Sequence, residues 1–496
     1  MAVQLIPTGT TVTLPDGITL RTPGLVGEAD ASLVPPSQQR DAGVAAPGWM
    51  NDALAANGAR SRYVVELRNT EPVRVEASMD VRTAYGEPAM VATVPPPPPE
   101  HLQVALVTDE SGVMTWAVAE PSQPLGVRDG GDQTFVLRGT VPPAAGNVEQ
   151  RGFGGWLAKK IIRFVVIPVA KRAAAEVGEV IVRRWEASNR PHRLRSFTPE
   201  DFCTRGGETV PAELLTRWSG QRVLLFVHGT SDRADTSFGG MGRTLVGDLH
   251  RAYGGRIFAF DHPTLATGPI DNVKWFLDQL PPEIDLRLDI VCSSRGGLVS
   301  RILAERLADP RLAPFVGTRR VEVDRLVFSA TPNGGTRLVD TAHTGAYIDA
   351  MTNLLSLVPD NPVTDAADVI VSLAGDLAAG VVDQLTGLQA MHPDGDFLTW
   401  LNKQSRTRRR YFALTSDFEP QHAGLKKWAT DVLLDFVLGA PNDFVVPTAG
   451  VYSDVGGGAF PIAEHHEFDK SANVSHGGFF RQNVTHAHLR RWLRAE

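Results

Sequence analysis

The chain has 496 residues, 43% hydrophobic and 21% charged, which is typical of globular proteins and long enough for two domains. A formal net charge of -7 argues against a nucleic-acid partner, because no basic surplus is available to neutralise phosphates. Two cysteines cannot form a disulfide framework. The sequence opens without a signal-peptide pattern, and no uninterrupted apolar run reaches the ~18–20 residues that span a bilayer. We therefore expect a soluble, cytoplasmic protein.

Residues 1–145 predict a β-rich, sandwich-like module. Short runs of alternating polar and apolar residues, such as 63–68 and 103–107, are separated by Pro- and Gly-rich turns. This period-two pattern is typical of strands that are buried on one face. The run of five prolines at 95–99 predicts a stiff connection. No pattern here identifies a ligand or a protein partner for the module.

Residues 150–200 predict an amphipathic helical linker. Within 153–187, apolar residues such as Leu157, Ile161 and Phe164 recur at helical spacing, with lysines and arginines between them. Such a helix can bury its apolar stripe against the following domain, which is the interpretation we favour. The alternative is peripheral contact with an anionic membrane surface.

Residues 205–496 predict an α/β domain. Apolar runs end in turn-forming residues and alternate with helical patterns; the runs lie at 221–227, 256–260, 288–292, 324–330 and 410–415. This alternation predicts right-handed crossovers and one mostly parallel sheet flanked by helices. In such a sheet, functional residues gather at the carboxyl ends of the strands.

Ser294 is the candidate nucleophile. It is the central residue of Cys292-Ser293-Ser294-Arg295-Gly296, a Gly-x-Ser-x-Gly pattern in which Cys replaces the first Gly. A strand, a sharp turn and a helix in this order hold a serine hydroxyl out at the strand end. Ser293 is one position out of register. The spacing therefore favours Ser294.

The backbone N–H groups of Thr230 and Arg295 are the candidate oxyanion hole. Gly229 follows a predicted strand, and a glycine there lets the backbone turn an N–H into a cleft. The N–H after the nucleophile completes the pair that stabilises a tetrahedral oxyanion. We expect the Arg295 side chain to be a solvated arm that pairs with a surface carboxylate; the alternative is that it places an acidic or polar substrate group.

Taken in order, these motifs resemble the α/β-hydrolase superfamily, in its lipase-like branch of bacterial triacylglycerol lipases and GPI-inositol deacylase-like enzymes. The matching segments are 227–230, 293–298, 330–336 and 442–447, followed by a C-terminal histidine. The resemblance covers residues of about 218–496. It implies an α/β-hydrolase fold with a helical cap at about 338–408, where apolar helical patterns would form an acyl pocket. Ordinary core helices are an equally good interpretation of that insertion.

The resemblance also implies an acid between the serine and a later histidine. Asp443 matches the acid of the Asn-Asp-Gly-x-Val element of lipase-like members, although Phe444 stands where they have Gly. Asp417, directly after the predicted strand at 410–415, is the alternative acid. We favour Asp443.

His476 is the candidate base. It precedes two glycines and a terminal amphipathic helix, which is where members of the superfamily carry the catalytic histidine. His486 and His488 fall inside that helical pattern, and packing or surface roles suit them better. His465 and His466 lack the partner spacing of a metal site, so we expect no metal and no cofactor.

Together these residues predict a serine hydrolase that cleaves carboxylic esters, acting on a small-molecule or lipid-like substrate. An acyltransferase or an amidase would use the same triad. The rival from another class is a non-catalytic interaction protein that uses the hydrolase fold as a scaffold. The ordered Ser, Asp and His favour the enzyme.

Overall fold

The computed structural model describes residues 2–35, 47–73, 89–120, 131–137, 159–168, 178–340, 343–356, 364–380, 382–403, 410–421, 423–433, 441–453 and 460–495. The chain forms two units. The first comprises Met1–Val177, Thr344–Val382 and Pro420–Asp435, and the second comprises Gly178–His343, Asp383–Glu419 and Phe436–Glu496. Each is described separately below. No helix in the described ranges combines the length and apolar content needed to cross a bilayer.

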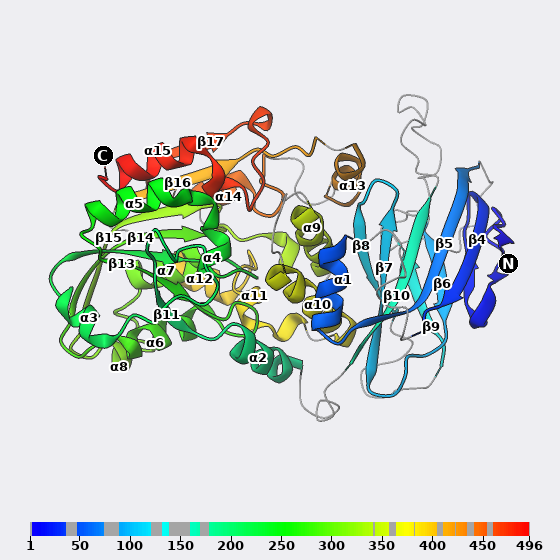
Figure 1. The fold of residues 1–496 in the computed structure, drawn as a ribbon, viewed down its shortest axis with the longest axis horizontal. Helices are drawn as coiled ribbons and strands as arrows, with labels where there is room; N and C mark the ends of the chain where they lie inside the picture. The colour runs from blue at the N-terminus through cyan, green and yellow to red at the C-terminus, as the bar shows by residue number, and fades with distance from the viewer. Residues whose placement is uncertain are drawn as a thin grey trace. The chain divides into compact units, whose positions relative to one another are not determined.

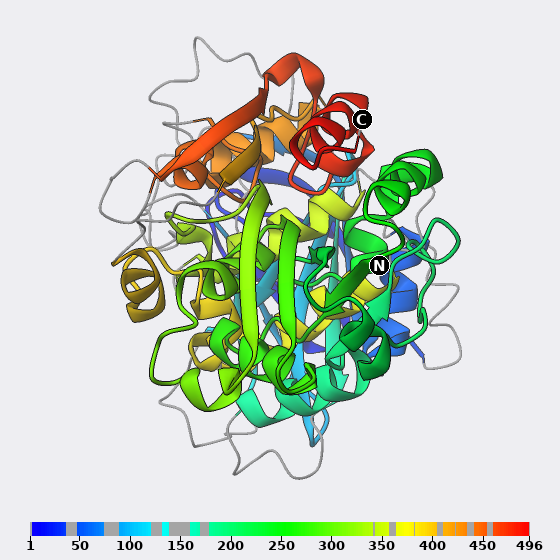
Figure 2. The same ribbon diagram turned by 90° about the vertical axis from the view of Figure 1, so that its left-hand side faces the viewer.

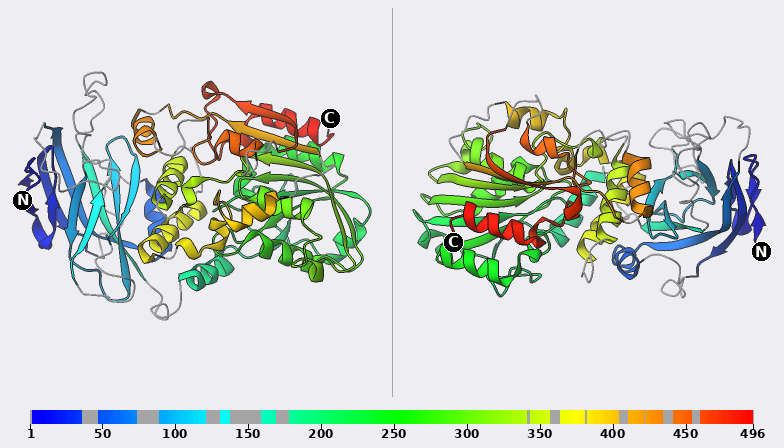
Figure 3. Two further views of the ribbon diagram at one scale, coloured as in Figure 1. Left: turned by 180° about the vertical axis from the view of Figure 1, so that it is seen from behind. Right: turned by 90° about the horizontal axis from the view of Figure 1, so that it is seen from above.

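The first unit contains two antiparallel sheets that share a core (Figure 3). The six-stranded sheet has the order β1 (Val3–Gln4), β4 (Leu25–Leu33), β5 (Arg60–Pro72), β10 (Lys160–Pro168), β7 (His101–Asp109) and β8 (Met114–Val118). The four-stranded sheet has the order β2 (Val12–Thr13), β3 (Thr19–Arg21), β6 (Met90–Val94) and β9 (Gln133–Leu137). Leu67 and Phe164 of the larger sheet pack with Met90 and Phe135 of the smaller one. The runs at 63–68 and 103–107 lie in β5 and β7.

Strand β10 corrects the prediction of a helical linker. Residues 160–168 pair antiparallel with both β5 and β7, so the helix expected there is wrong. The segment is apolar and rich in Ile and Val, and such runs suit a strand whose two faces are both covered. Arg163 is buried and donates to Ser61 Oγ and Asn51 Oδ1, each at 2.8 Å. Burial lowers its pKa to about 10.

Only part of the predicted linker is helical: α2 covers Gly178–Asn189 and belongs to the second unit. Residues 151–158 and 169–177 lie outside the described ranges. Membrane contact through 153–187 stays a prediction. The buried strand in its middle cannot supply the apolar stripe of a surface helix.

The insertion predicted as a cap is divided between the units. Helices α9 (Thr344–Ser356) and α10 (Thr364–Ala379) belong to the first unit, with α1 (Gly48–Ala56) and α13 (Ala423–Leu433). Both α9 and α10 pack against the β7–β8 end of the six-stranded sheet. Helices α11 (Thr386–Gln389) and α12 (Asp396–Asn402) belong to the second unit.

Helix α9 covers the edge of strand β8 with polar side chains. Asn353 accepts from the Met114 N–H at 2.9 Å and donates to the Met114 carbonyl at 2.7 Å. Asp349 accepts from the Trp116 N–H at 2.7 Å, and the Trp116 indole donates to Thr352 Oγ1 at 3.0 Å. An unpaired strand edge invites association with other chains. Here a helix satisfies the backbone groups that another strand would otherwise bind.

The second unit is built on a seven-stranded sheet (Figures 1 and 2). Its order is β11 (Arg193–Ser196), β13 (Ile257–Asp261), β12 (Arg222–Val227), β14 (Asp285–Ser293), β15 (Arg320–Ser329), β16 (Arg410–Ser416) and β17 (Ile462–Phe468). Every pairing is parallel except that of the edge strand β11. This arrangement confirms the predicted α/β fold for the second half of the chain.

Helices cover both faces of this sheet (Figure 2). Helices α5 (Gly242–Ala252) and α15 (Asn483–Trp492) share one core with the sheet. Helices α6 (Pro269–Gln279) and α7 (Gly296–Glu305) lie on the other face and pack against each other. The remaining helices of the unit are short: α3 (Ala212–Arg217), α4 (Ala234–Ser237), α8 (Ala313–Val316) and α14 (Thr448–Tyr452).

Candidate functional site

Ser294 lies in the sharp turn between β14 and α7. Its φ of 49° is left-handed, a region that non-glycine residues adopt at a cost and that marks strained turns. Its N–H donates to the Ser329 carbonyl at the end of β15, at 2.8 Å. The predicted nucleophile is therefore held at the carboxyl end of the central strands, in the backbone conformation of a nucleophile elbow.

The elbow packs directly on the end of β12. A Cβ on Gly296 would lie 2.4 Å from the carbonyl oxygens of both Val227 and His228, so only glycine fits there. A Cβ on Gly229 would lie 2.8 Å from the Cβ of Ser294. The loop predicted to carry one oxyanion donor thus touches the serine.

Cys292 replaces the first glycine of the motif without strain. It is buried in β14, and its thiol donates to the Val327 carbonyl at 3.2 Å. Burial raises the pKa of this thiol to about 12. The side chain is therefore a neutral packing group rather than a nucleophile.

The two predicted oxyanion donors differ in what their side chains do. The Thr230 hydroxyl donates to the Met391 sulfur at 3.7 Å. The Arg295 side chain is fully buried, and it donates to the carbonyls of Gly387 at 2.8 Å and Thr267 at 2.6 Å. The expected solvated arm is wrong. The residue after the serine starts a helix that is packed on the sheet, so its side chain joins the elbow to the neighbouring loops.

Glu186 of α2 is a buried residue that sequence reasoning missed. Its carboxylate accepts three backbone N–H bonds, from Thr264 at 2.5 Å and from Leu265 and Ala266 at 2.8 Å. The next residue along, Thr267, accepts from Arg295. The loop after β13 is therefore fixed from both sides, and one side is the elbow itself. Helix α2 contains two glutamates and two arginines, and no local pattern distinguishes Glu186 from the other charged residues.

His476 and Asp443, predicted separately, are hydrogen-bonded to each other. His476 Nδ1 lies 2.8 Å from Asp443 Oδ2, and the His476 N–H donates to the Asp443 carbonyl at 3.0 Å. The other carboxylate oxygen accepts from the N–H groups of Val445 and Val446 at 3.0 and 2.8 Å. Asp443 is 2% exposed. A carboxylate held this way fixes the proton on Nδ1 and leaves Nε2 as the basic nitrogen.

Phe444 adopts the conformation that glycine would supply. Its φ is 88°, and its N–H donates to Asn442 Oδ1 at 2.9 Å. Its ring stands edge-on to Phe418, with centroids 5.6 Å apart. The substitution therefore keeps the turn that presents Asp443, and aromatic packing offsets the backbone cost.

Asp417, the alternative acid, has a different partner. Its carboxylate lies 3.9 Å from Lys470 Nζ, and its N–H donates to the Phe468 carbonyl. Among the described residues, the carboxylate hydrogen-bonded to His476 is that of Asp443. The structure thus pairs the favoured acid with the favoured base.

The loops that carry Asp443 and His476 are both attached to the end of β16. Ser416 Oγ donates to the Val474 carbonyl at 2.5 Å, and Thr448 Oγ1 donates to the Ser416 carbonyl at 2.8 Å. Strands β14, β15 and β16 run parallel, so this is the same edge of the sheet that carries Ser294. The other C-terminal histidines lie elsewhere: His486 binds the Phe480 carbonyl, and the rings of His466 and His488 contact each other.

His228 supports the loop beside the serine. Its Nε2 accepts from the His262 N–H at 3.0 Å, and its Nδ1 lies 2.9 Å from the Gly229 carbonyl. The two imidazoles stack with centroids 4.2 Å apart. Burial lowers the pKa of both histidines. His228 is therefore a neutral Nδ1–H tautomer that binds its own loop rather than a general base.

Comparison with known proteins gives one family match. Residues 189–494 match the model of a family described as a domain of unknown function, DUF7379. No curated protein matches the chain.

Similar solved structures include a lipase of Bacillus licheniformis, with 17% identity over 55% of this chain and 92% of that one, at a TM-score of 0.34. Lipase 1 of Pelosinus fermentans has 13% identity over 53% and 94%, at a TM-score of 0.36. A metagenomic carboxyl esterase has 16% identity over 59% and 80%, at a TM-score of 0.30.

Proposed function

We propose that this chain, which belongs to the DUF7379 family, is a serine hydrolase of the lipase- and esterase-like kind that cleaves carboxylic esters. The observation that carries the proposal is the Ser294 turn. A left-handed serine between a parallel strand and a helix, in contact with the Gly229 loop, is the arrangement that a nucleophile elbow needs. A left-handed φ costs energy at a residue that is not glycine, and residues in this conformation often occur at functional turns.

In the proposed reaction, Ser294 Oγ attacks the ester carbonyl carbon while its proton passes to His476 Nε2. The carbonyl oxygen becomes an oxyanion that the N–H groups of Thr230 and Arg295 stabilise. When the ester bond breaks, the leaving alkoxide takes the proton from His476 and departs as the alcohol. Water then attacks the acyl-enzyme with the same base, and releases the acid and free Ser294.

Asp443 has a positioning role in this scheme. Its hydrogen bond to His476 Nδ1 sets the tautomer and stabilises the imidazolium formed when the serine loses its proton. The two backbone N–H groups on its other oxygen keep the carboxylate from rotating away. Buried and hydrogen-bonded, it can supply this charge throughout turnover.

The test is covalent labelling of the intact chain with a fluorophosphonate probe, followed by turnover of p-nitrophenyl esters of increasing chain length. We expect the wild type to be labelled, Ser294→Ala to be unlabelled and Ser293→Ala, the adjacent serine, to be labelled. Absence of labelling in a folded wild type would favour the non-catalytic interaction protein. Transfer of the acyl group to an added alcohol in preference to water would shift the assignment to an acyltransferase, and faster cleavage of a matched amide to an amidase.

A further inference from the structure

A pocket of about 160 Å³ in the second unit has four arginines among its lining residues. Its lining comes from the end of α2, from β11 and the loop after it, and from the ends of β12 and β13. The lining residues are Asn189, Arg190, Pro191, Arg193, Arg205, Gly206, His228, Arg233, Asp261 and His262. A space of this size suits one small polar group and is too small for a long acyl chain.

The pocket adjoins the proposed oxyanion loop. His228, which lines it, is the residue before Gly229, and Gly229 is in contact with Ser294. Asp261 and His262 line it from the end of β13, the strand next to β12. The pocket and the elbow therefore share the carboxyl edge of the sheet, where ligands bind in open α/β folds.

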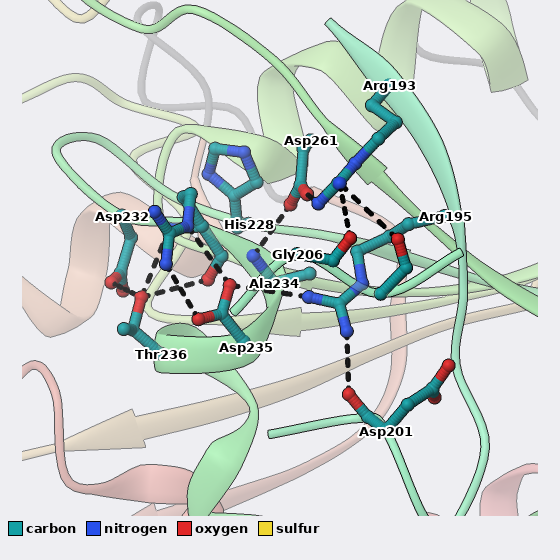
Figure 4. Close-up of polar contacts among 12 residues, drawn as sticks. Arg193, Arg195, Asp201, Gly206, His228, Asp232, Ala234, Asp235, Thr236 and Asp261 are labelled. Carbon is teal, nitrogen blue, oxygen red and sulfur yellow. Dashed lines mark hydrogen bonds and ion pairs between the residues drawn. The ribbon is translucent and has the colours of Figure 1, made fainter. Parts of the chain in front are cut away.

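Carboxylates hold the guanidinium groups of Arg193 and Arg233 in place before any ligand arrives. Arg193 Nη2 lies 3.1 Å from Asp261 Oδ2, and Arg233 binds both oxygens of Asp235, at 3.1 and 2.8 Å. Fully buried Arg195 lies beside Asp235 (Figure 4) and binds it at 3.3 Å, so two arginines share this carboxylate. A ligand that binds here need not order these side chains, which favours affinity.

The charge of the lining favours an anion. The lining holds four arginines and one carboxylate, that of Asp261, and Asp235 next to the lining pairs with Arg233, so the arginines still outnumber the carboxylates. Arg190 and Arg233 are 4% and 8% exposed, so their charges act in a partly desolvated space where attraction to an anion is stronger than in water. Planar guanidinium groups match the oxygens of carboxylates and phosphates.

His262 adds an independent observation. It is 1% exposed and lines the pocket, and within the described part of the chain its Nε2 has no hydrogen-bond partner. Buried polar atoms are rarely left unbonded, because the loss of hydration is not recovered. Its Nδ1 lies 3.3 Å from the Phe260 carbonyl, which can only accept, so Nδ1 carries the ring proton and Nε2 is an acceptor. A ligand O–H, such as that of a monoprotonated phosphate, would satisfy this nitrogen.

We propose that this pocket binds a carboxylate or phosphate group of the ester substrate, so that the enzyme prefers esters that carry a negative charge. The inference rests on the proposed function for its link to catalysis, while anion binding itself can be measured without turnover. The arginines select the charged group, and the adjoining loop places the ester carbonyl at Ser294.

The binding test uses the full-length Ser294→Ala protein and calorimetric titration at fixed ionic strength with inorganic phosphate and, separately, with succinate. The variant Arg205→Ala removes an exposed arginine of the lining, and Arg217→Ala removes an exposed arginine of α3 outside it. We expect binding of at least one anion, weakened about tenfold by Arg205→Ala and unchanged by Arg217→Ala. The anion that binds more tightly identifies the chemistry. No binding, or equal loss in both variants, overturns the pocket assignment.

The kinetic test compares kcat/KM for p-nitrophenyl butyrate with that for esters of similar length ending in a carboxylate or a phosphate. We expect the wild type to prefer a charged ester, Arg205→Ala to reduce that preference about tenfold, Arg205→Glu to reduce it further and Arg205→Lys to restore part of it. A ratio that is the same in wild type and Arg205→Glu overturns the proposed preference. Anion binding without hydrolysis of any ester would instead overturn the proposed function while leaving an anion site.

Discussion

The two units use buried polar side chains in opposite ways. In the first, Asp349 and Asn353 form hydrogen bonds with the backbone of strand β8, and these contacts cover a sheet edge. In the second, Asp443 and His476 bind each other and leave one imidazole nitrogen for other partners. The first arrangement pairs buried side chains with buried backbone groups, as a structural contact should. The second leaves the Nε2 atom of His476 available to accept a proton, as a reactive site requires.

We expect the largest effect from substitutions in the proposed catalytic residues of the second unit. Ser294→Ala and His476→Ala should each lower ester turnover by about 10⁴–10⁶-fold, because nucleophile and base act as a unit. The measurement is kcat on the best p-nitrophenyl ester, with Ser293→Ala as the control. A much smaller loss in His476→Ala would move the base to another histidine.

Asp443→Asn should have the next largest effect. It keeps the shape of the side chain but removes the charge that orients His476, and loss of such a carboxylate typically lowers kcat by about 10⁴-fold. Asp417→Asn is the matched control and should be far milder, because Asp417 faces Lys470. If the two losses are reversed in size, Asp417 is the acid.

Asp349→Ala tests the contact between helix α9 and the edge of strand β8. The Trp116 N–H would lose its acceptor and remain buried, which should lower the free energy of unfolding by about 1–3 kcal/mol. Urea denaturation followed by tryptophan fluorescence measures this, with the exposed Ser356→Ala on the same helix as the control. Equal stability of the two variants would show that the edge contact is dispensable.

Glu186→Gln should also lower the free energy of unfolding, by about 1–3 kcal/mol. The amide keeps one acceptor oxygen, whereas three backbone N–H groups converge on the carboxylate. Because the same loop is bonded to Arg295, we expect kcat to fall as well. Thermal melts and kcat should be compared with the exposed Glu213→Gln of α3. If stability falls and kcat does not, the loop that Glu186 binds does not influence the turn at Ser294.

The smallest expected effect concerns the thiols. Burial raises the pKa of Cys292 to about 12, so below that pH the group stays protonated and unreactive. Iodoacetamide at pH 8 should therefore modify the exposed Cys203 alone in the native protein, and both cysteines in urea. Mass spectrometry gives the stoichiometry; rapid native modification of Cys292 would contradict the packing of the elbow.

The sequence was most informative where a site depends on residues that are adjacent in the chain. The elbow at Ser294 and the turn at Asp443 are local motifs, and the structure shows the backbone conformations that they predict. Their catalytic roles stay predictions. The strand at 160–168 was missed because a run that is buried on both faces carries no period-two pattern to distinguish it from a helix.

Other features depend on residues that are far apart in the chain. The arginines that line the proposed anion pocket are at positions 190, 193, 205 and 233. In the sequence they are indistinguishable from separate surface charges. The buried Arg295 has its acceptors at Thr267 and Gly387, so no local pattern shows that its side chain turns inward. Long-range contacts of this kind require the fold to be known first.

The contact between β8 and α9 has a consequence for synthesis of the protein. Met114 and Asn353 are 239 positions apart, so a growing chain exposes the open side of its first sheet while the whole Ser294 region is still being translated. An uncovered strand in a nascent protein is prone to join the same strand of a neighbouring molecule. Truncation after the first 177 residues should thus yield aggregates, and supplying the 344–382 helices in trans offers a way to keep such a fragment dispersed.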